Sequence, residues 1–87
     1  MNSKKKIEIK QVKVIERKLG RERRWGWAWE HGKIEIDSTL KGKKRLSTLC
    51  HELIHLICPE KSETQVLKDE KLFANTLWNE NYRKVDN

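Results

Sequence analysis

The sequence predicts an α+β fold in which a three-stranded antiparallel sheet is covered by two helices. Apolar residues alternate with charged or small ones in the first half of the chain, which is the period of a strand. In the second half they recur at helical spacing, interrupted at Pro59. A chain of 87 residues is the size of one domain, so we expect a single domain over residues 1–87.

The N-terminal segment, residues 1–24, is predicted to form a basic strand and turn. Residues 6–17 alternate apolar and charged side chains, and the alternation changes phase near Lys10 and Gln11, which indicates a bulge. Residues 18–24 are rich in arginine and lysine and contain a glycine, so they are predicted to be a turn.

A hairpin is predicted over residues 25–38. Trp25, Trp27 and Trp29 alternate with small residues, which places all three indoles on one face of a strand. That face is either core beneath a helix or a surface for a partner or substrate. After a turn at His31-Gly32, Lys33–Asp37 is the second strand, with its two isoleucines directed inward.

Two helices are predicted, over about residues 45–58 and about residues 62–79. Pro59 ends the first helix, and Ser62 is a suitable N-cap for the second. Residues 38–44 are expected to be a basic loop. The second helix should bury one apolar stripe, consisting of Val66, Leu67, Phe73, Ala74, Leu77 and Trp78.

The first helix carries the sequence His51-Glu52-Leu53-Ile54-His55. Histidines four residues apart lie one turn from each other on the same helix face, so both imidazoles can reach one zinc ion. The glutamate beside the first histidine can accept the proton of a zinc-activated water. We therefore expect His51 and His55 to be zinc ligands and Glu52 to be the general base.

Two histidines leave such a site one protein ligand short. Glu63 is the preferred third ligand, because the short loop around Pro59 makes the helices antiparallel and brings the start of the second helix near His55. Glu70, on the same helix face, and Cys58, three residues after His55, are the alternatives. Cys50 and Cys58 lie too far apart along one helix to form a disulfide with each other.

Charge is unevenly placed along the chain. Residues 1–24 hold ten Lys/Arg and three Glu, so they carry the whole net charge of +7. A nucleic acid or an acidic partner could therefore bind through residues 4–24, although a solvated strand edge explains the same charges. No apolar run is long enough to span a membrane, and the N-terminus lacks the apolar core of a secretion signal, so a cytoplasmic location is expected.

The segment from Gly32 to Asp37, the basic loop and the motif helix together resemble small phage and bacterial gluzincin-like metallopeptidases, in the style of the ImmA/IrrE-type and SprT-like groups. The resemblance covers about residues 25–78. It implies a minimal zincin-like fold with His51, His55 and Glu63 as zinc ligands and Glu52 as base. It also implies that Lys33–Asp37 is an edge strand along which an extended substrate pairs.

The expected function is zinc-dependent hydrolysis of peptide bonds in a protein or peptide substrate. A non-catalytic, zinc-stabilised binding module, associated with nucleic acid through the basic segment, is the alternative. The residue that would stabilise the transition state is not evident from the motif. Tyr82 and Arg83 are the late candidates for that role.

Overall fold

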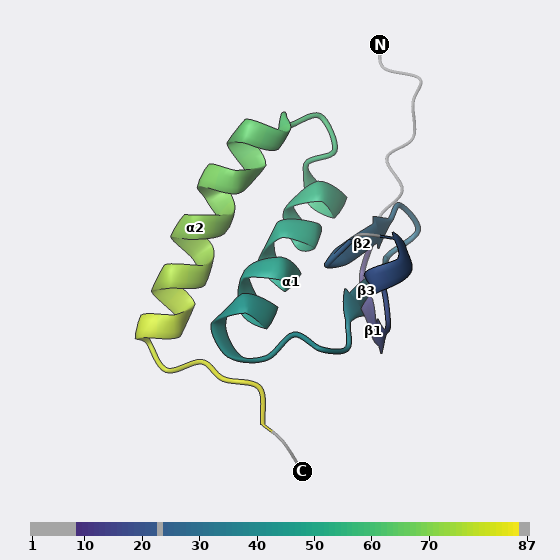
Figure 1. The fold of residues 1–87 in the computed structure, drawn as a ribbon. Coiled ribbons are helices and arrows are strands. Elements are labelled where there is room, and N and C mark those ends of the chain that lie inside the picture. Colours follow the sequence, from purple (N-terminus) through teal and green to yellow (C-terminus); the bar gives the residue numbers. More distant parts are fainter. Residues whose placement is uncertain (1–8, 23, 86–87) are drawn as a thin grey trace.

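A computed structural model describes residues 9–22 and 24–85 of the chain. It is an α+β fold in which two helices lie side by side and one of them packs against a three-stranded sheet (Figure 1). The elements in chain order are β1 (Lys13–Arg17), η1 (Gly20–Glu22), β2 (Gly26–Trp29), β3 (Lys33–Asp37), α1 (Gly42–Ile57) and α2 (Glu63–Asn79).

The sheet is mixed, so the prediction of a purely antiparallel sheet was wrong. Its strand order is β1-β3-β2. β2 and β3 form the predicted antiparallel hairpin, whereas β1 pairs with β3 in parallel, from Lys13 opposite Lys33 to Arg17 opposite Asp37. The hairpin pattern specifies only the β2–β3 pairing. β1 pairs with the remaining edge of β3, and the chain between them, which contains η1 and β2, is long enough for a parallel connection.

The first strand is shorter than the predicted range of residues 6–17. Residues 9–12 are not part of a strand, so the bulge expected near Lys10 and Gln11 is absent there. Residues 6–8 lie outside the described part of the chain. Pairing begins at Lys13, whose backbone N–H donates to the Gly32 carbonyl oxygen at 2.9 Å.

The first helix begins three residues before the predicted position 45. Gly42 has a φ of 57°, a left-handed value that turns the chain sharply into α1. Lys43 and Lys44, expected in a loop, are the next helical residues. Their positive charges oppose the helix dipole, so charge near a helix start was a poor guide to where this one begins.

The main core lies between β3 and α1. Ile34 and Ile36 are 0% exposed, which confirms that they point inward from β3. They contact Leu40 and Leu56, and the half-buried Leu49, Leu53, Ala28, Ile9 and Val12 surround this cluster. The sheet and the motif helix are therefore held together by the same apolar side chains.

The second helix is anchored on α1 by a narrower stripe than the sequence predicts. Val66 and Ala74 are 0% and 1% exposed, but Leu67 and Phe73 are 45% and 51% exposed, so including these two in a buried stripe was wrong. Among the described elements, α1 is the one that α2 contacts extensively, and a helix with one main neighbour needs only a narrow apolar face. The predicted N-cap is confirmed, since the Ser62 hydroxyl accepts a hydrogen bond from the Gln65 backbone N–H at 3.2 Å.

The tryptophans do not lie beneath the helix. Side chains alternate along β2, and Gly26 faces the α1 residues Thr48 and Glu52. Trp27 and Trp29 therefore point to the opposite side of the sheet. Trp25 precedes the strand at a bend and does not join them, because Lys44 of α1 lies over its ring.

Neither helix in the described part of the chain has the length and apolar character needed to cross a membrane.

Candidate metal centre

The two motif histidines lie one turn apart on α1 and present their Nε2 atoms to each other. These atoms are 3.1 Å apart, and the ring planes are inclined at 68°. Ile54 and Leu56, which interleave with the motif, are buried against neighbouring elements. Burial of these apolar residues fixes the rotation of α1, which leaves the histidines at one border of its packed surface.

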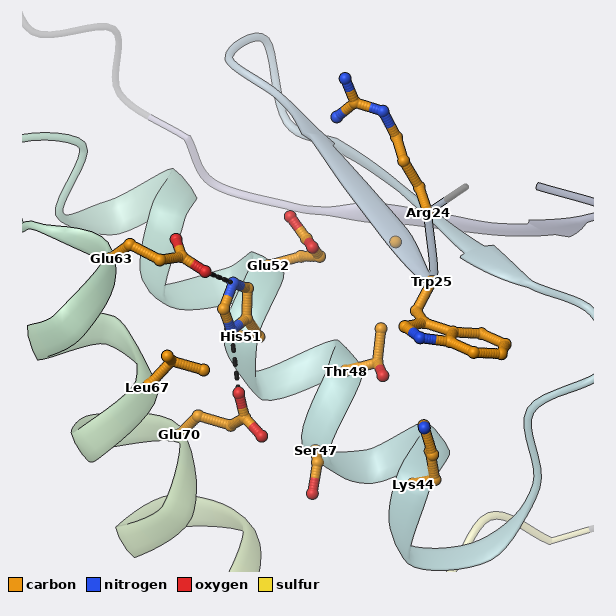
Figure 2. Close-up of a pocket in the computed structure, with 11 residues that line it drawn as sticks. Arg24, Trp25, Lys44, Ser47, Thr48, His51, Glu52, Glu63, Leu67 and Glu70 are labelled. Atoms are coloured by element: carbon orange, nitrogen blue, oxygen red, sulfur yellow. Dashed lines mark hydrogen bonds and ion pairs between the residues drawn. The ribbon is translucent and has the colours of Figure 1, made fainter. Parts of the chain in front are cut away.

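Glu63 reaches the same point from the first turn of α2. One carboxylate oxygen lies 3.1 Å from His51 Nε2, and the other lies 3.0 Å from His55 Nε2 (Figure 2 shows the former contact). The Ser62 cap fixes the start of α2, and the short 58–62 loop places that start beside the end of α1. The sequence-predicted ligands His51, His55 and Glu63 thus converge, and they form the one group of metal-ligating side chains found among the described residues.

The separations between these ligand atoms suit a small tetrahedral ion. Ligands bound to zinc at about 2.0–2.1 Å in a tetrahedron are about 3.3 Å from one another. The two Nε2 atoms are 3.1 Å apart, close to that value, and the two oxygens of Glu63 each lie 3.0–3.1 Å from one of them, so the carboxylate faces both imidazoles. Two imidazole nitrogens and one carboxylate are also a donor set that zinc accepts, and three protein ligands leave a fourth position open. The residues therefore fit a zinc ion.

Glu70 occupies a different place from the one that a third ligand requires. Its Oε1 lies 2.8 Å from Nδ1 of His51, on the opposite edge of the ring from Nε2 (Figure 2). A carboxylate there accepts the Nδ1 proton and keeps Nε2 free for a metal. Cys58, the other alternative ligand, is the C-cap residue of α1 and does not belong to the metal-ligating group.

Glu52 lies against the edge strand rather than among the ligands. Burial raises the pKa of its carboxyl group. Among the described residues it has no hydrogen bond or ion pair. A Cβ atom placed on Gly26 would lie 3.0 Å from Glu52 Cγ, so the bare backbone of β2 makes room for this side chain. A carboxylate in such surroundings is suited to accepting a proton.

A cleft of about 510 Å³ lies beside these groups, and an adjoining hollow continues along β2. β2, not β3, is the strand at this edge, so the expectation that Lys33–Asp37 forms the edge was wrong: β3 is the central strand. The family resemblance had implied that residues 33–37 form the substrate edge, but alternation along a strand shows which side chains point inward and not whether the strand is central or at an edge.

The outer edge of β2 presents backbone groups to this cleft. The Asp37 N–H donates to Trp25 O, and the register pairs Trp27 with Glu35 and Trp29 with Lys33, so the odd-numbered residues of this segment bond toward β3. In an antiparallel pair the intervening residues direct their N–H and C=O groups the other way. Gly26 and Ala28 therefore point these groups to the open edge, where they line the hollow together with His51 and Glu52.

Tyr82 and Arg83 do not approach the histidines. Both line a separate pocket at the opposite end of α1, near Gly42, and the Arg83 guanidinium lies 3.4 Å from the Trp78 ring centroid. Arg24 instead lines the cleft that contains Glu52. Sequence reasoning missed Arg24 because it is one of many basic residues in the turn before β2, and only the fold brings it to the cleft.

No protein-family model matches this chain, and no curated protein or solved structure is significantly similar to it. The chemical interpretation of the site therefore depends on its own residues and their geometry.

Proposed function

We propose that this protein is a minimal zinc-dependent peptidase. The observation that carries the proposal is the convergence of His51, His55 and Glu63. The carboxylate of Glu52, which has no hydrogen bond or ion pair within the described part of the chain, lines the same hollow. Three ligands and a neighbouring base are the parts that peptide hydrolysis by a zinc enzyme requires. The resemblance of the motif helix to small gluzincin-like proteins supports the same interpretation, a zinc-dependent peptidase.

His51 and His55 would hold the metal through Nε2, and Glu63 through its carboxylate. Bound zinc supplies a Lewis acid that lowers the pKa of a coordinated water to about 7 and polarises the substrate carbonyl. Glu70 keeps His51 in the tautomer that can bind metal.

Glu52 is the general base. Its carboxylate accepts a proton from the attacking water and returns it to the leaving amine. Burial disfavours the charged carboxylate, so accepting a proton is easier here than in open solvent. Arg24 borders the same cleft with its guanidinium stacked on Trp27, so it provides positive charge at the rim of the cleft.

The substrate is a polypeptide bound in extended form along β2. The outward N–H and C=O groups of Gly26 and Ala28 would pair with the main chain of the substrate, which adds a strand to the sheet. Main-chain pairing positions a peptide bond without demanding particular side chains. The small residues at 26 and 28 keep this edge accessible from the α1 side.

The test combines metal content with cleavage. Purified protein is expected to contain one zinc per chain and to cleave an unfolded protein or a library of extended peptides. Glu52→Gln should retain zinc and lose activity by about 10²–10⁴-fold, because only the proton acceptor is removed. Glu60→Gln, an exposed loop glutamate, is the matched control and should behave like the parent protein.

Two outcomes would contradict the proposal. The metal site would be excluded if the purified parent protein lacked stoichiometric zinc, or if the His51→Ala variant retained zinc. Full activity or full biological function of Glu52→Gln would exclude catalysis, and would instead make the protein a zinc-stabilised binding module.

A further inference from the structure

The face of the sheet opposite α1 presents side chains of its own. Strand alternation and the pairing register place these residues together there, and we call them the open sheet face: Lys13, Ile15, Arg17, Trp27, Trp29, Lys33 and Glu35. Both helices lie on the other side of the sheet (Figure 1). At one end, the Leu19 backbone N–H donates to Asp37, so the turn after β1 covers that end only.

Two indoles form a stacked pair on this face. The ring centroids of Trp27 and Trp29 are 4.9 Å apart and their planes differ by 5°. The Arg24 guanidinium lies 3.8 Å from the Trp27 centroid, and Lys33 Nζ lies 5.2 Å from the Trp29 centroid. We call this arrangement of four side chains the cation–aromatic column.

Glu35 of β3 holds the column in place. Trp29 Nε1 donates to Glu35 Oε1 at 3.2 Å, and Arg17 donates to the same carboxylate at 2.7 and 3.1 Å. Glu35 is only 6% exposed. A buried carboxylate that is held by Arg17 and also accepts the indole N–H fixes the ring, so the aromatic surface is formed before any ligand arrives.

The charge exposed on this face is positive. Lys13 is exposed, as is Arg24 next to the face, and Lys33 is half-buried. The carboxylate on the face, Glu35, lies beneath Trp29 and is paired with Arg17. A ligand therefore meets cations and flat rings and little negative charge.

We propose that the open sheet face binds single-stranded nucleic acid. Bases would extend the column at its ends, by stacking on the outer face of the Arg24 guanidinium or on the outer face of Trp29 beside Lys33. Phosphates would pair with Lys33 and Lys13. Duplex DNA keeps its base faces inside the stack and cannot use the rings. An acidic polypeptide would engage the cations but has no planar groups that would use the aromatic pair.

The open sheet face is not the same surface as the basic segment 4–24, to which the charge distribution of the sequence assigned nucleic-acid binding. Part of residues 4–24 lies outside the described chain, and the column is formed mainly by residues 24–33. The column shares Arg24 and Trp27 with the rim of the hollow beside the histidines, whereas Trp29 and Lys33 line neither the cleft nor that hollow. Variants at Trp29 and Lys33 therefore test nucleic-acid binding separately from peptidase activity.

The test is fluorescence anisotropy of a labelled oligothymidine 12-mer, with a hairpin duplex of equal charge and poly-glutamate as competitors. Trp29→Ala should weaken binding about five- to a hundredfold, because base stacking on an aromatic ring is lost. Trp29→Phe keeps a ring and should retain most of the affinity, which separates stacking from folding. Phe73→Ala, an exposed ring on α2, is the matched control and should bind normally.

Salt dependence gives a second measure. Lys33→Ala should lower the slope of log affinity against log salt by about 0.7, the value for one phosphate contact to a single strand. Lys71→Ala, on the exposed part of α2, should leave the slope unchanged. His51→Ala should bind the oligomer normally, whatever its effect on metal or cleavage.

Three results would overturn the proposal. The first is no binding of the single strand at low salt. The second is equal affinity for the duplex. The third is that Trp29→Ala binds the oligothymidine as tightly as the parent protein does and that poly-glutamate competes as well as unlabelled oligothymidine. That result would make this face a site for acidic polypeptides.

Discussion

The Nδ1 atom of His51 lies 2.8 Å from Oε1 of Glu70, a residue nineteen positions later on the neighbouring helix. This contact sets which nitrogen of the ring is free to bind a metal. Glu70→Ala is expected to weaken zinc affinity about 10–100-fold without removing a ligand. Competition with a chelator of known affinity measures this change.

The Glu70→Gln variant refines that prediction. Its amide oxygen can still accept the Nδ1 proton, so its zinc affinity should fall by less than that of Glu70→Ala. Glu80→Ala, beyond the far end of α2, should bind zinc as the parent does. Equal affinities for the parent and both Glu70 variants would show that this contact does not orient His51.

Gly26→Ala is expected to impair catalysis selectively. The added Cβ would lie 2.9 Å from Thr48 Cγ2 and 3.0 Å from Glu52 Cγ, so the Glu52 side chain must shift. Peptidase activity should fall roughly ten- to a hundredfold while zinc content stays at one per chain. Gly20→Ala, whose Cβ meets no atom within 4 Å, is the control. An active Gly26→Ala enzyme would argue against a fixed position of Glu52.

Stability should fall in acid because two carboxyl groups on β3 have lowered pKa values. Hydrogen bonds from Thr39 and Leu19 lower the pKa of Asp37 below its ordinary value of 3.8, and Arg17 lowers that of Glu35 below 4.5. Each group therefore stabilises the fold fully above its ordinary pKa, and this contribution is lost as the pH falls through the lowered value.

Urea unfolding between pH 7 and pH 3 measures this effect. The free energy of unfolding should decline below about pH 4.5, as expected for carboxyl groups whose ordinary pKa is about 4. Asp37→Asn should be less stable at pH 7, because one acceptor becomes an amide donor facing the Leu19 N–H. The difference between this variant and the parent should shrink toward pH 3, and a constant difference would show that the Asp37 charge is unimportant.

Ser62→Ala should destabilise the protein by about 1 kcal/mol, because the Gln65 N–H loses its side-chain acceptor. Urea denaturation of the metal-free protein measures the change. Thr64→Ala, also exposed in the first turn of α2, is the matched control. Equal losses of stability in the two variants would show that the cap contributes nothing specific.

Cys58→Ser should leave the zinc content at one per chain, because Cys58 is outside the group formed by the histidines and Glu63. Zinc analysis after dialysis tests this expectation, with His55→Ala as the variant that should lose the metal. Loss of zinc from Cys58→Ser would instead indicate a closed site with a sulfur ligand.

The helical half of the site could be predicted because its geometry is local. Spacing on one helix placed His51 beside His55, and a short loop followed by Ser62 placed Glu63 near them. The role of Glu70 was not predictable, because two glutamates on one helix face differ only in which edge of the imidazole they meet. That distinction depends on how α2 lies along α1.

The sheet was less predictable because its pairing is not local. Alternation identified β2 and β3 but could not show that β1 joins the far side of β3 in parallel. That choice determines which strand remains at the edge beside Glu52. For the same reason Trp27 and Trp29 were assigned correctly to one strand without revealing that they face away from α1, and the placement of Trp25 on the same strand face was wrong.

The nineteen-residue span from His51 to Glu70 also has a consequence for the order of folding. The pairing of β1 with β3 spans a similar distance, twenty residues from Lys13 to Lys33, so the two loop closures cost similar entropy. The order in which the sheet and the helix pair form therefore depends on the order in which their residues are made. In a growing chain the residues of the sheet come first, so the surface that presents a substrate would already be in place when Glu63 completes the chemical centre.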